Sequence, residues 1–357
     1  MLLAGPHKDS AQLLKLLPPE VNYIEVKDLQ REISPARDLR ALLELKNELA
    51  GLEPAIVHTH TSKAGALGRL AAAMANLHAK RPAIVIHTPH GHLLYGYYGP
   101  LKTFIFRLAE KFLSSFTDYF IALTPGEMRE SAAAGLGKPG QWTVVHSGVE
   151  FKPPAIPLHK HDLEIAGDEL TIGTVARLEP VKGVEYFIRA AALLYHRLPA
   201  EKLRFVVIGG GELETKLRNL AGNLGVRDRF VFTGFRGDAA ALMGALDVYV
   251  QPSLNEAMGR APLEAQALGV PVVVSRVCGL PDTIEEEKTG LTVKPGDAEA
   301  LAAAIERFVL SPKLRARMGE AAKAWAAAPD ETGFPRFGVE SMNAHLLAFY
   351  RKVLSKP

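Results

Sequence analysis

Short apolar runs alternate with helical periodicity along most of the chain. The runs that we expect to form strands cover residues 21–26, 55–60, 84–87, 119–122, 142–146, 170–176, 205–208, 230–233, 248–250, 272–274 and 290–293. Leucines recur at the spacing of an amphipathic helix over residues 38–52. Strands that alternate with helices predict parallel, doubly wound sheets. Ligands of such sheets bind beyond the carboxyl ends of the strands, where we expect His60, His90 and Thr124.

A segment of prolines and mixed charges divides the chain. We expect residues 151–168 to link two domains, residues 1–150 and residues 169–334. A chain of 357 residues is long enough for each domain to bury its own core. Helical segments are predicted after the last strand, at residues 298–310, 312–328 and 337–354.

Composition excludes several classes of protein. The chain is 48% hydrophobic and 23% charged with a net charge of +3, and it has no charge run typical of a nucleic-acid-binding arm. The single cysteine, Cys278, excludes an internal disulfide and favours a reducing cytoplasm. No apolar run reaches the ~18 residues that span a bilayer. The first ten residues lack the pattern of a secretion signal.

The stretch from Pro252 to Val274 carries the strongest chemical signal. A helix is predicted to begin at residues 257–259, where free N–H groups and the helix dipole favour a phosphate. Glu256 precedes the first turn and Glu264 is expected about two turns in, roughly 12 Å further along the axis. A sugar, a diphosphate and a ribose joined in a line would suit that spacing. Judged by spacing alone, two such glutamates are more often solvated.

Two cations follow the first strand of the second domain. Arg177 and Lys182 flank a loop that ends at Gly183. Such a pair can stabilise the negative charge of a departing nucleoside diphosphate without a metal, although isolated surface cations are common. Gly209 and Gly211 form a turn after the next strand, a weak signal that is consistent with a nucleotide pocket.

Five histidines gather near strand ends. They are His58, His60, His87, His90 and His92. A metal site is disfavoured because they come from separate strands without carboxylates at ligand spacing. Most are expected to be satisfied by the backbone. His90 is assigned to the cleft because a residue followed by glycine at a strand end can approach a ligand closely.

The central stretch resembles the retaining GT-B glycosyltransferases that use nucleotide sugars. The resemblance lies in Glu256, seven residues and Glu264, set between Pro252-Ser253 and the Gly-Val-Pro-Val-Val run from residue 269. Residues 57–65 and 87–91 look like a subgroup that acts in bacterial surface-polysaccharide synthesis. The resemblance covers nearly the whole chain. It implies two Rossmann-like α/β domains facing a cleft, with a helix beyond residue 335 that crosses back to the first domain.

The resemblance also implies roles for individual residues. Catalysis is assigned to Arg177, Lys182, Glu256 and His90. Arginine and lysine would hold the donor diphosphate, Glu256 would orient the donor sugar, and His90 would lie beside it. Further donor contacts are assigned to Ala257, Met258, Gly259, Glu264, Gly209, Gly211, Gly234, Phe235 and Arg236, with Glu264 on the ribose and residues 234–236 beside the nucleobase.

The sequence departs from the family pattern in three places. Ala257 and Cys278 stand where glycine is usual; the first change is expected to be mild and the second to narrow the pocket. Family members also begin with an apolar strand, a Gly-Gly turn and a helix before the segment that residues 1–6 resemble. Without that unit the first sheet would expose an apolar edge. Either the start codon was assigned late, or the enzyme is truncated and weak or inactive.

The expected activity is transfer of a sugar from a UDP-sugar to an acceptor hydroxyl on a lipid-linked or polysaccharide precursor, with retention of configuration. The sequence contains no Asp-x-Asp, so neither a metal nor another cofactor is expected. A nucleotide-sugar 2-epimerase and an inactive nucleotide-sugar-binding protein are the alternatives. The sequence does not indicate an oligomeric state.

Residues 94–116 are rich in aromatic side chains with interspersed cations. They are predicted to form either a basic amphipathic helix at a membrane interface or a loop leading into an ordinary core helix. The first alternative would place the protein at the inner face of the cytoplasmic membrane, because family members commonly act on lipid-linked acceptors.

Overall fold

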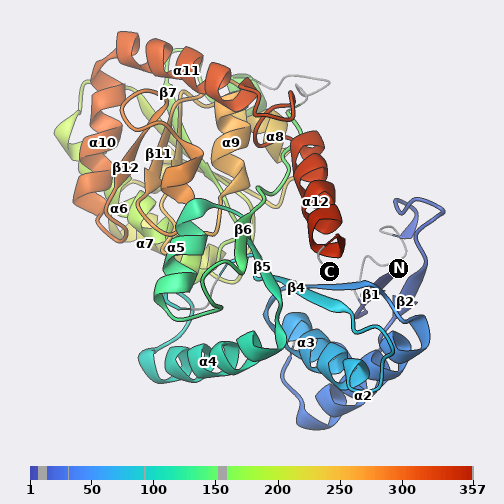
Figure 1. The fold of residues 1–357 in the computed structure, drawn as a ribbon. Helices are drawn as coiled ribbons and strands as arrows, with labels where there is room; N and C mark the ends of the chain where they lie inside the picture. Colours follow the sequence, from blue (N-terminus) through green and yellow to red (C-terminus); the bar gives the residue numbers. More distant parts are fainter. Residues whose placement is uncertain (7–13, 31, 92–93, 152–158, 356–357) are drawn as a thin grey trace.

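The computed structural model describes residues 1–6, 14–30, 32–91, 94–151 and 159–355, and it has two α/β domains (Figure 1). In the first domain the strands are β1 (Leu2–Ala4), β2 (Tyr23–Glu25), β3 (Ile56–His60), β4 (Ile84–Thr88), β5 (Tyr119–Ala122) and β6 (Trp142–Val144). Its helices are α2 (Pro35–Leu52), α3 (Ser62–Asn76), α4 (Pro100–Leu113) and α5 (Pro125–Ala133), with a 3₁₀ turn η1 (Ser114–Phe116).

The first domain holds two parallel sheets. One has the order β3-β4-β5-β6, and β1 pairs with β2 in the other. Adjacent residues of β4 face opposite ways: Val85 packs against α2 and α3, whereas Ile86 packs beneath the C-terminal helix. This alternation is what a strand buried on both faces requires.

The second domain is one six-stranded parallel sheet with the order β12-β11-β10-β7-β8-β9. Its strands are β7 (Leu170–Val175), β8 (Leu203–Ile208), β9 (Phe230–Gly234), β10 (Val248–Gln251), β11 (Val272–Ser275) and β12 (Gly290–Val293). The helices are α6 (Val184–Arg197), α7 (Glu214–Asn223), α8 (Ala239–Met243), α9 (Arg260–Ala267), α10 (Ala298–Leu310), α11 (Pro312–Ala327) and α12 (Val339–Leu354). The 3₁₀ turns among the described residues here are η2 (Lys160–Leu163), η3 (Pro180–Lys182), η4 (Arg227–Arg229) and η5 (Leu280–Thr283).

Two apolar cores lie on opposite faces of this sheet. Phe205 and Val207 of β8 enter the core beneath α6 and α10, whereas Val206 and Ile208 enter the core beneath α8 and α9. The predicted parallel, doubly wound architecture is therefore confirmed. Residues 152–158 of the expected linker lie outside the described residues, and further along it Leu163 and Ile165 are buried in the second core.

The last helix returns to the first domain. α12 packs on β4 and β5 through Met342, Leu346, Phe349 and Val353 (Figure 1). The loop before it is fixed by the carboxylate of Asp330, which accepts hydrogen bonds from Thr332, Ser341 and His345.

Helix α4 differs from the other long helices because only Leu113 among its residues is buried. The prediction of an ordinary core helix in this segment is therefore wrong. No helix among the described residues has both the length and the apolar content needed to cross a bilayer.

Candidate functional site

The loop between β10 and α9 lies at the carboxyl edge of the second sheet. The helix begins at Arg260, directly after the predicted residues 257–259. Gly259 has φ +75°, and a Cβ there would lie 2.4 Å from the Leu280 side chain. Because this conformation is not helical, the helix starts late, and Glu264 lies one turn into it rather than two. The predicted spacing of roughly 12 Å assumed helical rise from Glu256 onward, and that assumption is wrong because residues 257–259 precede the helix.

Lys182 and Glu256 meet at the centre of this edge. The Lys182 ammonium donates to Glu256 Oε2 at 2.5 Å, and both side chains are less than one-fifth exposed, at 17% and 19%. Ser253 Oγ donates to the same carboxylate oxygen at 3.4 Å. A shielded ion pair of this kind costs free energy to desolvate, so the pairing requires good geometry.

Backbone contacts bring the two loops together. The Leu254 N–H donates to the Val181 carbonyl at 2.7 Å. Gly183, at φ +63°, lies so close to the loop that a Cβ would be 2.1 Å from the Pro252 carbonyl oxygen. Only glycine tolerates both the positive φ and that approach. The sequence therefore places Lys182 beside Glu256 through the glycine that follows it.

Arg177 reaches the same region from a more exposed position. Its guanidinium pairs with Glu179 at 2.7 Å, and its side chain is 64% exposed. Arg177 and Glu256 both influence the phenol of Tyr97. Burial raises the pKa of this phenol, the charge of Glu256 raises it further, and the charge of Arg177 lowers it. Arg177 and Glu256 therefore act on the Tyr97 phenol with opposite sign.

Tyr97 comes from the first domain, and sequence reasoning did not assign it to the site. The loop that carries it passes close to the second domain, because a Cβ at Gly96 would lie 3.0 Å from Asn255 Cβ. Asn255 also donates to the Tyr95 carbonyl at 2.8 Å. The available signal was the sequence Tyr95-Gly96-Tyr97, since a glycine between aromatic residues permits such a close approach.

Glu264 lies within α9. Burial raises the pKa of this half-buried carboxyl, and Arg260 opposes the shift. A carboxylate with little water around it is a strong acceptor for hydroxyl donors. Glu264 therefore lies in α9, whereas Glu256 lies in the loop that precedes this helix.

The two glycine turns lie together at the next strand ends. The Gly209 N–H donates to the Gly234 carbonyl at 2.9 Å, and a Cβ at Gly211 would lie 2.7 Å from the Leu178 nitrogen. Phe235 is 87% exposed at this turn. Arg236 turns away to pair with Asp238 at 2.7 and 2.6 Å. The exposed ring is suited to stacking, whereas the Arg236 guanidinium is already engaged.

Three of the five histidines form a connected group. His60 Nδ1 and His90 Nε2 lie 2.9 Å apart, and the rings of His58 and His60 are 4.2 Å apart. Burial lowers the pKa of His60 to about 4 and also lowers the pKa of His90, which favours the neutral form of both rings. His87 is buried within β4, where it contacts Thr59 at 2.9 Å. His92 lies outside the described residues.

The loop that presents His90 is held by a buried acid. Glu127 accepts from the Gly91 and Leu123 N–H groups at 2.7 Å each. Burial raises the pKa of its carboxyl, while these two N–H groups favour the charged form. His90 itself has φ +56°, an uncommon conformation that this anchoring maintains. These backbone contacts hold the loop that places His90 beside His60, and the assignment of His90 to the donor cleft stays a prediction.

The two domains touch at the two residues that depart from the family pattern. Thr124 Oγ1 donates to the Ala257 carbonyl at 2.9 Å, and the side chain of Ala257 is buried in an apolar cluster between the domains. Cys278 adopts φ +43°, which is costly for a residue other than glycine. A Cβ at Gly126 would lie 2.1 Å from the Cys278 carbonyl oxygen, so the backbones of these two segments are in close contact.

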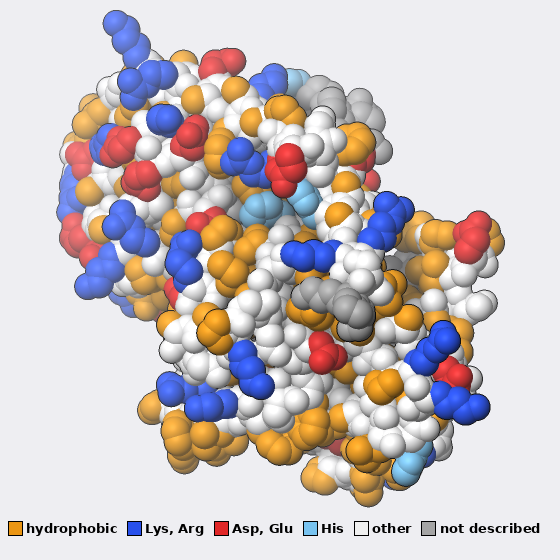
Figure 2. Space-filling model, viewed as in Figure 1, with side chains coloured by type: hydrophobic (Ala, Val, Ile, Leu, Met, Phe, Trp, Pro, Cys, Tyr) orange, Lys and Arg blue, Asp and Glu red, His pale blue; other side chains and the backbone are white. Residues whose placement is uncertain are grey.

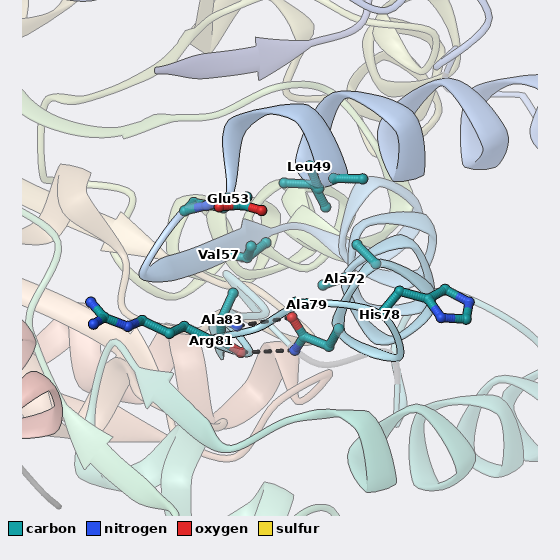
Figure 3. Close-up of a pocket in the computed structure, with 12 residues that line it drawn as sticks. Leu49, Glu53, Val57, Ala72, His78, Ala79, Arg81 and Ala83 are labelled. Atoms are coloured by element: carbon teal, nitrogen blue, oxygen red, sulfur yellow. Dashed lines mark hydrogen bonds between the residues drawn. The ribbon is translucent and has the colours of Figure 1, made fainter.

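A small cavity elsewhere in the first domain is not part of this site. Leu49, Val57, Ala72 and Ala83 line it between α2 and α3, and Asn76 bonds both backbone groups of Ala83 beside it (Figure 3). It lies at the amino ends of β3 and β4, whereas the residues above lie at carboxyl ends. Ligands of doubly wound sheets bind at the carboxyl ends.

Family comparisons match both domains. The family model described as "Glycosyl transferase 4-like domain" matches residues 5–148, and that described as "Glycosyl transferases group 1" matches residues 156–325. The UDP-Gal:alpha-D-GlcNAc-diphosphoundecaprenol alpha-1,3-galactosyltransferase of Escherichia coli is 30% identical over 84% of this chain and 78% of its own. The putative glycosyltransferase EpsD of Bacillus subtilis is 31% identical over 84% and 79%.

Solved structures share the fold. HepE of Anabaena, solved in complex with UDP, superposes with a TM-score of 0.76 at 22% identity, covering 98% of this chain and 92% of its own. Sucrose-phosphate synthase from Thermosynechococcus elongatus gives a TM-score of 0.78 at 24% identity, covering 95% and 85%.

Proposed function

The chain belongs to the group 1 glycosyltransferases of GT-B fold, and from that premise we propose that it moves a sugar from a UDP-sugar to an acceptor hydroxyl with retention of configuration. The observation that carries the proposal is the shielded Lys182–Glu256 pair at the carboxyl edge of the second sheet. In the proposed complex, the cation of this pair adjoins the donor diphosphate and its carboxylate adjoins the donor sugar.

The proposed reaction exchanges one C1–O bond for another. The bond from the sugar C1 to the β-phosphate oxygen breaks, and the acceptor oxygen bonds to C1 on the same face. The acceptor proton passes to the departing diphosphate oxygen, so no further base is needed. Lys182 and Arg177 stabilise the charge that develops on the diphosphate, because fixed cations in a shielded site act most strongly on a charge that forms there.

In the proposal, the carboxylates of Glu256 and Glu264 bind different parts of the donor. Glu256 accepts hydrogen bonds from the sugar hydroxyls, and the N–H groups of residues 257–259 adjoin the diphosphate. Glu264 accepts from the ribose hydroxyls, and the exposed ring of Phe235 stacks on the base. His90, held neutral by burial, faces the sugar from the first domain.

We extend the proposal to a metal-independent mechanism. The lysine and arginine supply the positive charge that a divalent ion provides elsewhere, and the sequence has no Asp-x-Asp to bridge such an ion to a diphosphate. The UDP-sugar would be a substrate, and no further cofactor enters the reaction.

The proposed acceptor is a lipid-linked precursor at the inner face of the cytoplasmic membrane. Support comes from the relatives, one of which is named for a diphosphoundecaprenol-linked acceptor and another, from Staphylococcus aureus, for capsular polysaccharide biosynthesis. The chain would then work in cell-envelope polysaccharide synthesis.

A donor panel tests the proposal. UDP release is measured from several UDP-sugars with and without diphosphoundecaprenol-linked sugars, and NMR assigns the anomeric configuration of the product. We expect acceptor-dependent release and a product of the donor's configuration. An altered sugar formed from the donor alone would indicate an epimerase, and UDP-sugar binding without turnover would indicate a binding protein; either result contradicts the proposal.

A further inference from the structure

Helix α4 turns its apolar stripe outward. Leu101, Phe104, Ile105, Leu108 and Phe112 recur at intervals of three and four residues, and each is between 52% and 74% exposed. Residues at these intervals share one face of a helix. A helix on the surface of a globular protein normally buries its apolar face, so this orientation requires an explanation.

A buried ion pair sets that orientation. Glu110, on the opposite face of α4, accepts from the fully buried guanidinium of Arg69 at 2.8 and 3.0 Å. Breaking such a pair would leave a charge without a partner inside the protein. Rotating α4 to bury the apolar stripe would break this pair and leave the Arg69 guanidinium buried without its carboxylate.

Cations flank the stripe on both sides. At 100° per residue, Arg107 and Lys111 lie along one border and Lys102 lies along the other, and all three are exposed. The acid of this helix, Glu110, is engaged by Arg69. Figure 2 shows the result at the lower left, where hydrophobic side chains adjoin Lys and Arg side chains over the region of α4 in Figure 1.

The charge pattern distinguishes between two occupants of this face. A second copy of the chain would bring three cations of each copy against those of the other, and like charges repel. An anionic lipid surface matches both features, because the cations meet headgroup phosphates while the stripe enters the acyl boundary.

We propose that α4 is a membrane-docking helix for an anionic bilayer. Its outward stripe, defined by the five residues above, lies in the headgroup–acyl boundary, with Lys102, Arg107 and Lys111 on the phosphates. The helix begins at Pro100, three residues after Tyr97, so docking holds the loop beside Glu256 at the membrane surface. That this position brings the site close to a lipid-linked acceptor rests on the proposed function, whereas the docking itself does not.

Vesicle co-sedimentation tests the docking with the full chain. The probes are vesicles of phosphatidylcholine alone and vesicles of equal parts phosphatidylglycerol and phosphatidylcholine. We expect binding to the anionic vesicles that weakens as salt rises. The Leu101→Ser/Leu108→Ser variant should bind on the order of tenfold or more weakly. Neutralising Lys102, Arg107 and Lys111 to glutamine should cost roughly fivefold per cation on anionic vesicles only.

Leu39→Ser/Leu43→Ser is the matched control. These leucines are also exposed on a surface helix, α2, in the same domain. This variant should bind vesicles like the wild type. The docking proposal is overturned if the α4 and α2 variants bind equally, if the wild type does not bind anionic vesicles, or if α4 instead drives concentration-dependent dimerisation in sedimentation velocity.

A second measurement separates the two proposals. UDP-sugar binding by calorimetry, without vesicles, should be unchanged in Leu101→Ser/Leu108→Ser, which also shows that the variant is folded. Vesicle binding without any UDP-sugar binding by the wild type would overturn the proposed function alone. UDP-sugar binding without vesicle binding would overturn the docking alone.

Discussion

Replacing Lys182 with alanine removes the cation at the centre of the donor site. Its ammonium lies 2.5 Å from Glu256 Oε2, and the two side chains are 17% and 19% exposed. The substitution leaves the loop glycine next to it unchanged, so the backbone contacts between the two loops should persist. It therefore tests the charge rather than the fold.

The expected loss is large in turnover and small in stability. Removing one preorganised charge from a developing anion costs on the order of 10²–10³ in kcat, or about 3–4 kcal/mol. The free energy of unfolding should fall by only about 1–2 kcal/mol, because water reaches part of the unpaired Glu256 carboxylate. If Lys182 acts on the transition state, kcat and kcat/KM should fall together, whereas a ground-state contact would mainly raise KM.

Lys202→Ala is the matched control. Lys202 also pairs with a carboxylate, Asp168, but both side chains are well exposed and the pair precedes β8 at the amino edge of the sheet. The assay is UDP release under donor saturation, with donor affinity from calorimetry and folding from circular dichroism. The control should keep turnover within about twofold. A folded, donor-binding Lys182→Ala enzyme with turnover within threefold of the wild type would refute the role of this cation.

Three further predictions concern other parts of the chain. Glu264→Gln should raise donor KM about tenfold with little change in kcat, as a ribose contact far from C1 requires; an unchanged KM in steady-state kinetics would exclude it. Burial, with the His60 charge, lowers the pKa of His58 to about 3, so stability present above pH 6.5 should fall as the pH falls toward 3. Between pH 7 and pH 5, the free energy of urea unfolding should fall less for His58→Asn than for the wild type. An equal fall would show that His58 does not cause the pH dependence. Asp330→Asn, which weakens the hydrogen bonds from Thr332, Ser341 and His345, should lower Tm by about 2–4 °C, and an unchanged melting curve would show that this carboxylate does not secure α12.

The bounds of many elements could be predicted because their signals are local. α10 runs from Ala298 to Leu310, as the sequence indicated, and the strands of the second sheet fall on the predicted apolar runs. Parallel strands that are buried on both faces appear in the sequence as continuous apolar runs. Such runs can be recognised without knowing which strands pair with them.

Local signals were not sufficient at α9 and α4. The start of α9 depends on Gly259, which has a positive φ and lies where a Cβ would clash with the side chain of Leu280, a residue of η5. In α4 the periodicity of apolar residues specifies a stripe, but not the side of the protein that it faces. Arg69 of α3 decides that side through its pair with Glu110.

The sequence by itself determined the chemistry available to this protein: the order of strands and helices, the glycines that permit close approach, and two cations and two glutamates near strand ends. Tertiary structure alone decided which of these groups meet. Lys182 pairs with a carboxylate 74 positions away, Asn255 donates to the Tyr95 carbonyl of the other domain across 160 positions, and His58 bonds Tyr350 across 292 positions. Such contacts depend on how whole sheets pack against each other, and no periodicity within a short segment encodes that packing.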